Sequence, residues 1–290
     1  MYSKFYRSFE DQFRGSEELI RNRHQNYANF FLPIASQLPG SSIFDAGCGR
    51  GEWIELMASN GFNCHGVDIN PKMINPNQKS IKVGNALEEL KLLKRESQVI
   101  ISSFHMVEHL QPTDIQEFIH DSFTALMPGG ILIIETPNIE NLSVASNSFW
   151  LDPTHIRPVN MVFLKFLCEE IGFYKTLIAR FNEDTHIISK DRLSLNDVLF
   201  KVSPDIALVA QKGPENTPLV NSLSSAFSAK YGFSLEELSI LYDYQRVGLN
   251  TLSNWYDYQK NLRNKISNLL LIRKLTRIIS GFKIKVISKN

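Results

Sequence analysis

The stretch that decides the fold runs from Ile43 to Asn70 and reads IFDAGCGRGEWIELMASNGFNCHGVDIN. It begins with an apolar strand pattern, which is followed by three glycines, Gly47, Gly49 and Gly51. A helical run then ends at Asn60-Gly61, and a second apolar strand pattern ends in Asp68. A strand, a glycine turn, a helix and a strand that ends in an acid together predict half of a nucleotide-binding α/β unit.

The residue types at this turn suit a nucleoside ligand. Glycines allow a tight turn and a close approach of a ligand to the main chain, and a helix that begins after Gly51 presents free N–H groups. Asp68 is placed to accept hydrogen bonds from both hydroxyls of a ribose. Asp45 stands two residues before the first glycine, where an acid suits a ligand with a cationic ammonium group and not a pyrophosphate.

The spacing Gly-x-Gly-x-Gly, with Asp45 before it, resembles motif I of the class I S-adenosylmethionine (SAM) methyltransferases. It differs from the Gly-x-Gly-x-x-Gly of dinucleotide enzymes, which argues against a dehydrogenase. Three later stretches are similar to methyltransferases of bacterial surface-polysaccharide synthesis, namely SFHMVEHL (103–110), PGGILIIETPN (128–138) and FWLDPTHIRP (149–158). The resemblance runs from residue 2 to residue 212. It implies an α/β fold with a Rossmann-like, seven-stranded, doubly wound sheet and an N-terminal helical cover.

The resemblance also implies how SAM is held. The expected cofactor residues are Asp45, Gly47, Gly49, Gly51, Asp68, Ile69, Asn85, Ala86, Phe104 and, from the N-terminal segment, Arg14. Arg14 would reach the carboxylate of SAM, and a solvated arginine at a helix end is the alternative. The family usually has Gly-Asp-Ala where this chain has Gly84-Asn85-Ala86. The side-chain oxygen of Asn85 can still accept a hydrogen bond from the adenine amino group, without a charge.

Histidines and acids that follow the strand Gln98–Phe104 are the candidates for the chemistry, because the resemblance places the reacting methyl group just beyond this strand. In one arrangement His155 or His109 is the general base, and Asp152 or Glu108 orients it. In the other, a divalent metal that grips neighbouring hydroxyls is bound by His105, Glu108, His109 and His155, the first three on one face of a helix. Certain ubiquinone-pathway and small-RNA O-methyltransferases carry a similar pattern at this place. We expect the first arrangement, so a metal ion is not expected.

The segment Thr136–Pro158 is predicted to be a long irregular insertion that binds the acceptor, because long loops inside compact domains usually have a function. Trp150 offers a flat apolar face for a sugar ring, and Arg157 can make a bidentate contact with a carboxylate or a phosphate. The structural alternatives are that Trp150 fills the core and that Arg157 pairs with Asp152. The polar character of the insertion favours a saccharide over an apolar quinone.

The sequence divides into a methyltransferase domain over residues 1–212 and a helical C-terminal extension over residues 213–290. The tail from Gln259 to Asn290 has nine Lys or Arg residues and no acid, and its apolar residues recur every three or four positions. This pattern predicts a basic amphipathic helix that lies on an anionic membrane surface. Packing on the core or on a partner helix is the alternative, because the same pattern serves both.

The composition limits the remaining partners. The net charge of +1 gives no sign of nucleic-acid binding. Three scattered cysteines indicate a reducing cytoplasm, and no apolar run reaches the roughly 18 residues of a membrane span. We therefore expect a cytoplasmic enzyme, with a peripheral position on the inner face of the membrane if the tail binds there.

The predicted function is SAM-dependent O-methylation of a sugar hydroxyl on a bacterial surface polysaccharide or its lipid-linked precursor, with capping of the chain as one form of it. The resemblance supplies this substrate class, because some terminators of O-antigen chains join a methyltransferase to a helical, membrane-seeking tail. The alternatives are an O- or N-methyltransferase for a small molecule, such as a quinone or a secondary metabolite, and a SAM-fold scaffold without catalysis.

Overall fold

A computed structural model of the chain describes residues 12–75, 78–184, 187 and 192–246. The predicted basic tail Gln259–Asn290 lies outside the described residues, and so does the beginning of the predicted N-terminal cover, residues 1–11. None of the described helices combines the length and the apolar character that a membrane-crossing segment needs.

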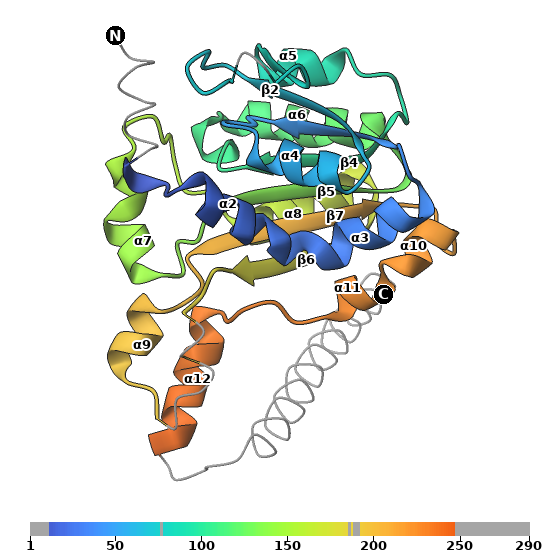
Figure 1. Cartoon of the computed structure of the whole chain (residues 1–290). Coiled ribbons are helices and arrows are strands. Elements are labelled where there is room, and N and C mark those ends of the chain that lie inside the picture. The colour runs from blue at the N-terminus through green and yellow to red at the C-terminus, as the bar shows by residue number, and fades with distance from the viewer. Residues whose placement is uncertain (1–11, 76–77, 185–186, 188–191, 247–290) are drawn as a thin grey trace, which may run out of the picture.

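A single mixed sheet forms the centre of the molecule (Figure 1). Its strands are β1 (Ser42–Ala46), β2 (Asn63–Asp68), β3 (Ile81–Val83), β4 (Gln98–Phe104), β5 (Leu126–Pro137), β6 (Phe173–Phe181) and β7 (Asp205–Lys212). They lie in the order β3-β2-β1-β4-β5-β7-β6, and β7 runs antiparallel to both of its neighbours. The predicted seven-stranded, Rossmann-like sheet is confirmed.

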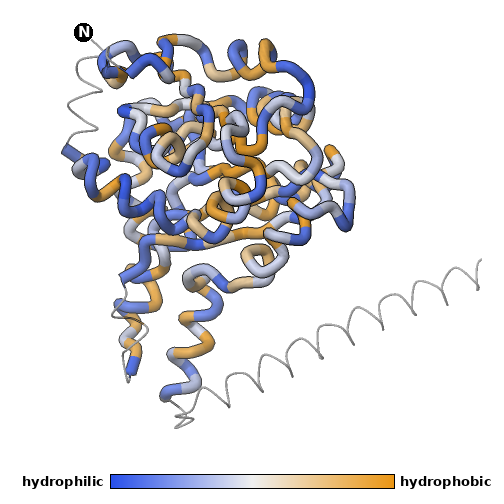
Figure 2. The backbone as a smooth tube through the Cα atoms, turned by 45° about the vertical axis from the view of Figure 1, so that its right-hand side comes forward, coloured by the Kyte–Doolittle hydropathy of each residue, from blue (hydrophilic) through white to orange (hydrophobic). Residues whose placement is uncertain are grey.

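Helices cover both faces of the sheet, which confirms the doubly wound prediction (Figure 1). Alternate residues of a strand point to opposite faces, so Ile100 and Ile101 of β4 belong to two different core clusters. One cluster includes residues of α3 (Ala28–Gln37), α4 (Glu52–Ser59), α10 (Pro218–Ser222) and α11 (Ser224–Ser228), and the other includes residues of α5 (Ala86–Lys91), α6 (Pro112–Ala125) and α8 (Met161–Ile171). In Figure 2 the hydrophobic segments gather toward the middle of the molecule.

The N-terminal cover consists of α2 (Glu17–His24), a 3-10 turn (Gln25–Tyr27) and α3. Ser16 caps α2, since its hydroxyl oxygen accepts a hydrogen bond from the Leu19 N–H at 3.2 Å. Arg50 of the glycine turn donates to the carbonyl oxygen of Gly15 at 3.1 Å. This bond fastens the entrance of the cover to the turn, and it brings Arg14 beside Gly49.

Residues after Lys212 also pack against the core of the sheet. Leu219, Leu223 and Ala226 are buried in the cluster that also holds α3 and α4. A smaller cluster joins α9 (Leu195–Phe200) to α12 (Leu235–Arg246). The first helices of the predicted extension therefore pack on the sheet or on its connections.

Two local predictions were wrong. The segment 105–109 is no α-helix, because β4 ends at Phe104, His105 has a φ of +54°, and only Val107–His109 forms a 3-10 turn. The insertion Thr136–Pro158 holds α7 (Leu142–Ser146) and a 3-10 turn (Ser148–Leu151). Asn141 explains α7, since its side-chain oxygen accepts from two N–H groups of the first turn.

Candidate active site

A cavity of about 570 Å³ opens at the carboxyl ends of β1, β2 and β4. Seven of the ten predicted cofactor residues line it, namely Arg14, Gly47, Gly49, Asp68, Ile69, Asn85 and Ala86. Met106 contributes an apolar wall. We call this space the cofactor cavity, because ligands of open α/β sheets bind at the carboxyl ends of the strands.

Asp68 shapes the cofactor cavity through the main chain. Its carboxylate accepts hydrogen bonds from the N–H of Gly49 at 2.9 Å and the N–H of Asn70 at 2.8 Å. Gly47 has a φ of +72°, and a side chain there would come within 2.9 Å of Met106 Cγ. The turn therefore needs glycine both for its conformation and for the space in front of it.

Three predicted cofactor residues do not line the cavity but support it. Asp45 is buried and accepts a hydrogen bond from the Ser102 hydroxyl at 2.7 Å, and burial raises the pKa of its carboxyl to about 7. Gly51 precedes α4 with a φ of +89°, and a Cβ atom there would lie 2.5 Å from Ile81 Cδ1. Phe104 packs its ring against Trp53 under the cover.

Asn85 has a role that the sequence did not reveal. It lines the cofactor cavity, but its side-chain oxygen caps α5 and accepts from the N–H of Leu87 at 2.9 Å and of Glu88 at 3.4 Å. The predicted contact with an adenine amino group would share an oxygen that is already in use, and it stays a prediction.

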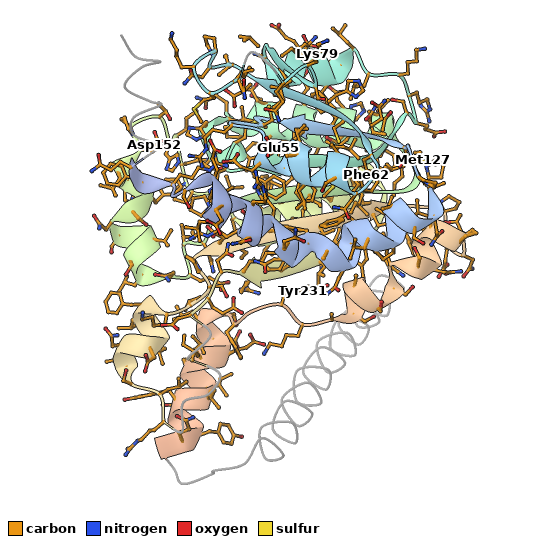
Figure 3. All side chains as sticks on the ribbon, viewed as in Figure 1. Glu55, Phe62, Lys79, Met127, Asp152 and Tyr231 are labelled. Carbon is orange, nitrogen blue, oxygen red and sulfur yellow. The ribbon has the colours of Figure 1, made fainter. Side chains whose placement is uncertain are left out.

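A second cavity of about 400 Å³ adjoins the first, between the cover and the segment that follows β5. We call it the acceptor cavity. Its polar lining includes Arg14, Arg23, His24, His105, Glu108, His109, Glu135, Asp152, His155 and Asp205. Figure 3 places Asp152 at the edge of the molecule where α2 begins. Arg14, His105 and His109 line both cavities, so the two spaces meet at these three side chains.

His105 lies among three carboxylates in the acceptor cavity. Its Nδ1 is 3.4 Å from Glu108 Oε1, and its Nε2 is 3.4 Å from Glu135 Oε1 and 3.5 Å from Asp205 Oδ1. Burial alone would lower the pKa of this imidazole, but Glu108, Glu135 and Asp205 together raise it to about 10. The ring is therefore a cation at neutral pH, and while it holds both protons it has no lone pair for a metal ion.

Other donors hold the outer oxygens of these carboxylates. The Tyr27 hydroxyl donates to Glu135 Oε2 at 2.6 Å, and the Asn182 amide donates to Asp205 Oδ2 at 2.6 Å. Neither acid was predicted from the sequence. Glu135 ends the apolar run ILIIE and Asp205 begins β7, so the antiparallel pairing of β5 and β7 brings them to one edge of the sheet. An acid at the end of an apolar strand was the available signal.

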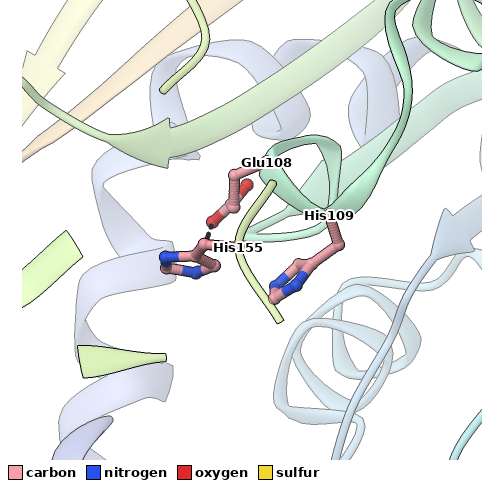
Figure 4. Close-up of side chains that lie close together, drawn as sticks. All are labelled: Glu108, His109 and His155. Atoms are coloured by element: carbon pink, nitrogen blue, oxygen red, sulfur yellow. Dashed lines mark ion pairs between the residues drawn. The ribbon is translucent and has the colours of Figure 1, made fainter. Parts of the chain in front are cut away.

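Glu108 is completely buried, and its Oε1 lies between His105 and His155. Figure 4 shows Glu108 with His155 and the neighbouring His109. Its Oε2 accepts from the Thr136 hydroxyl at 3.0 Å, while Oε1 has no hydrogen-bond partner of good geometry and lies 3.9 Å from His155 Nε2. Burial alone would raise the pKa of this carboxyl, but the cationic ring of His105 holds it below its ordinary value.

The tautomer of His155 follows from its partners. Its Nδ1 lies 2.5 Å from the carbonyl oxygen of Phe149, which can only accept a hydrogen bond. The Nδ1 therefore carries the proton, and the Nε2 lone pair faces Glu108 and Asp152, each at 3.9 Å. Burial lowers the pKa of His155, so the ring is neutral at pH 7 and can act as a base.

His109 is connected to Asp152 through Thr154, a residue that the sequence did not single out. Its Nδ1 is 2.9 Å from the Thr154 hydroxyl oxygen, which lies 2.6 Å from Asp152 Oδ1. The rings of His109 and His155 are 4.7 Å apart between centroids. The four predicted catalytic residues, Glu108, His109, Asp152 and His155, thus come together in one cavity.

Among the residues that the structure describes, two triplets have the spacing of metal ligands. Glu108, His109 and His155 offer ligand atoms within 4.8 Å of one another, and so do His105, Glu135 and Asp205. The first triplet retains three of the four predicted ligands. His105, the fourth, is a cation held by carboxylates. A protonated imidazole has no lone pair for a metal ion, so this state of His105 does not support its predicted role as a ligand. Metal binding stays the alternative to base catalysis that the sequence left open.

Trp150 and Arg157 lie outside both cavities. Trp150 is 59% exposed, and its indole N–H donates to the carbonyl oxygen of Ala145 at 2.9 Å. Trp150 therefore does not fill the core. Arg157 is also exposed, and Asp152 bonds to Thr154 instead. Their contact with an acceptor stays a prediction for a ligand that extends beyond the cavity.

The comparisons with known proteins agree with this geometry. A family model described as a methyltransferase domain matches residues 17–178, more than half of the chain. A crystal structure of a SAM-dependent methyltransferase from Archaeoglobus fulgidus is 30% identical with a TM-score of 0.64, covering 72% of this chain and 100% of that one. A probable SAM-dependent methyltransferase of Mycolicibacterium smegmatis is 30% identical over 145 residues, 48% of this chain and 54% of the relative, so the chain spans about half of that protein's length. The chain belongs to the family of SAM-dependent methyltransferases, whose cofactor is SAM.

Proposed function

We propose that the protein transfers a methyl group from SAM to a sugar hydroxyl of a bacterial surface polysaccharide or of its lipid-linked precursor. One observation carries this proposal. The cavity that the glycine turn builds adjoins a polar cavity with histidines and carboxylates, and His109 lines both. A base at such a junction is placed between a methyl donor and a hydroxyl acceptor.

The residues of the cofactor cavity fit SAM. Asp68 has a carboxylate at the end of β2 for the ribose, and Ile69 and Ala86 offer apolar surface for the adenine. Arg14 lies beside Gly49, where it can meet the carboxylate of the methionine part. SAM, when bound, supplies a methyl group on a sulfonium, which is open to in-line attack by an acceptor oxygen.

The residues of the acceptor cavity suit a hydroxyl acceptor. A sugar hydroxyl has a high pKa, so a base must remove its proton during the attack. His155 presents an Nε2 lone pair, because its Nδ1 donates to the carbonyl oxygen of Phe149, and the Nδ1 of His109 is hydrogen-bonded to the Thr154 hydroxyl. The buried carboxylates of Glu108 and Asp152 can accept hydrogen bonds from neighbouring hydroxyls. A volume of about 400 Å³ suits one sugar unit at a time.

Two parts of the proposal, the glycan acceptor and the position of the enzyme at the membrane, are based on the sequence. The stretches SFHMVEHL and FWLDPTHIRP, which resemble enzymes of surface-polysaccharide synthesis, provide His109 and His155 to the acceptor cavity. The basic pattern of residues 259–290 suits an anionic membrane, which would hold the enzyme at the inner face near a lipid-linked glycan. No part of this proposal calls for nucleic acid.

The test is an assay with radiolabelled SAM and lipid-linked glycans extracted from bacterial membranes, followed by mass spectrometry of the product. We expect label on a glycan hydroxyl in the full chain and none in Asp68→Ala. A matched control is Asp121→Ala on α6, whose carboxylate lies 3.1 Å from the exposed ring of His120 and lines neither cavity. Label in a quinone or another small molecule, with none in the glycan, would show the small-molecule alternative to be right.

Metal dependence is tested in the same assay. Activity should survive chelation with EDTA, because a histidine and not a metal ion removes the proton of the acceptor. Loss of all activity with EDTA and its return with a divalent metal would instead favour the triplet Glu108, His109 and His155 as ligands.

A further inference from the structure

We propose that Thr154 is a positioning residue, which is held by Asp152, fixes the proton of His109 on Nδ1 and so directs the Nε2 lone pair to the acceptor. The proposal rests on the proposed function in one respect, because it takes His109 to be the general base. It also selects between the two histidines that the sequence left open.

The hydrogen positions follow from the chemistry of three groups. The Thr154 hydroxyl oxygen is 2.6 Å from Asp152 Oδ1, and a carboxylate can only accept, so the hydroxyl hydrogen lies between these two oxygens. The same oxygen is 2.9 Å from His109 Nδ1. Because the hydroxyl hydrogen is already donated, the threonine oxygen can only accept there. His109 must therefore carry its proton on Nδ1 and keep a lone pair on Nε2.

Asp152 is itself held in place. The Thr154 backbone N–H donates to the same Oδ1 at 2.8 Å, so the acid receives two hydrogen bonds from one residue. Asp152 is only 6% exposed, and Thr154 is partly buried. A short, double connection of this kind leaves the threonine hydroxyl one orientation, which is the requirement for control of a tautomer.

The location of His109 distinguishes it from His155. His109 and Thr154 both line the cofactor cavity, and His109 lines the acceptor cavity as well. His155 lines the acceptor cavity alone, and its Nε2 faces the carboxylates of Glu108 and Asp152. A lone pair that serves the attack must lie where the two cavities meet, so His109 takes the proton and His155 contacts the acceptor.

The tautomer can be measured without knowledge of the acceptor. Nitrogen-15 NMR of histidine-labelled full-length protein distinguishes a protonated Nδ1 from a protonated Nε2, and His109→Gln assigns the signal among the seven histidines. We expect wild-type His109, when neutral, to be protonated on Nδ1. Thr154→Val removes the acceptor and should give a mixture of tautomers, while Thr154→Ser should restore the wild-type signal. Asp152→Ala frees the hydroxyl to donate to Nδ1 and should move the proton toward Nε2.

Thr124→Val is the matched control, because the Thr124 hydroxyl donates to a backbone carbonyl of its own helix at 3.2 Å. It should leave the His109 signal unchanged. A wild-type His109 protonated on Nε2, or the same tautomer in Thr154→Val as in wild type, would overturn the proposal. If Thr154→Val does not fold, the wild-type spectrum and Asp152→Ala still decide.

Turnover gives a second readout. With radiolabelled SAM and the membrane glycan extract, kcat of Thr154→Val should fall about tenfold or more, and Thr154→Ser should recover most of it. The KM for SAM should change by less than about threefold, because Thr154 fixes a proton and not the nucleoside. An extract that accepts no label would contradict the proposed function, whereas the tautomer would still decide the role of Thr154.

Discussion

The cofactor cavity and the acceptor cavity are built in different ways. Most of the cofactor cavity comes from one continuous region, Gly47 to Leu87, and its shape depends on main-chain conformation. The acceptor cavity takes side chains from five separate parts of the chain, and its chemistry depends on buried charge. A local motif can therefore encode the first, whereas only the tertiary fold assembles the second.

The substitution expected to distinguish the roles of the two cavities most strongly is at His109. His109→Gln should lower kcat by about 100-fold or more, the usual contribution of a general base, and leave the affinity for S-adenosylhomocysteine within about threefold. His155→Gln should cost less, about tenfold, because that ring reaches the acceptor cavity alone. Turnover is measured with the membrane glycan extract, and affinity by calorimetry. If His155→Gln proves the more damaging change, the bases are assigned the wrong way round.

A substitution at Glu135 tests the claim that buried charge holds the acceptor cavity together. Glu135→Leu removes one carboxylate from the cationic His105 and leaves the Tyr27 hydroxyl without its acceptor. The free energy of unfolding should fall by about 3–5 kcal/mol in urea denaturation. Glu117→Leu is the control, since Glu117 pairs with Lys91 at the surface, and it should cost less than about 1 kcal/mol. Equal losses in the two variants would contradict the role of the buried cluster.

A substitution at Asp68 tests the main-chain construction of the cofactor cavity. Asp68→Ala takes away the acceptor of two N–H groups in the turn and the acid expected at the ribose. The dissociation constant for S-adenosylhomocysteine should rise about 100-fold, which corresponds to about 2.7 kcal/mol. Asp114→Ala changes another acid in the lining and should have a much smaller effect. Calorimetry distinguishes the two, and an unchanged affinity in Asp68→Ala would place SAM elsewhere.

The sequence predicted more of the cofactor cavity than of the acceptor cavity. The glycine spacing and Asp68 predicted the cofactor cavity, because a turn of this kind restricts both sequence and geometry. The carboxylates around His105 were missed, since Glu135 and Asp205 meet only through the pairing of β5 with β7. The sequence singled out His109 and His155 as candidate bases by residue type, but the partners of their Nδ1 atoms, Thr154 and Phe149, could not be read from any spacing.

The pH dependence of stability should report on His105. Its folded pKa of about 10 lies above the ordinary value of 6.5, so its stabilisation is complete below about pH 6.5 and is lost as the pH rises through 10. Between roughly pH 7.5 and 9.5 the free energy of unfolding should fall by about 1.4 kcal/mol per pH unit from this group. His105→Gln should show less than half of that slope in urea titrations. Parallel curves for the two proteins would mean that His105 is not a cation in the folded state.

The smallest expected effect is that of substitutions at Asn85. This residue stabilises a helix and also lines the cofactor cavity. Asn85 caps α5 from the wall of the cofactor cavity, and Asn160 caps α8 with the same pair of bonds outside both cavities. Asn85→Ala and Asn160→Ala should therefore each cost about 1 kcal/mol of stability. If Asn85 also contacts adenine, only its substitution will weaken S-adenosylhomocysteine binding, by about five- to tenfold. Asn85→Asp keeps an equally good cap and an acceptor oxygen, so it should retain most of both properties. Equal nucleoside affinity in all three variants would leave Asn85 with the cap alone, and the adenine would then be held by the apolar surface of the cavity.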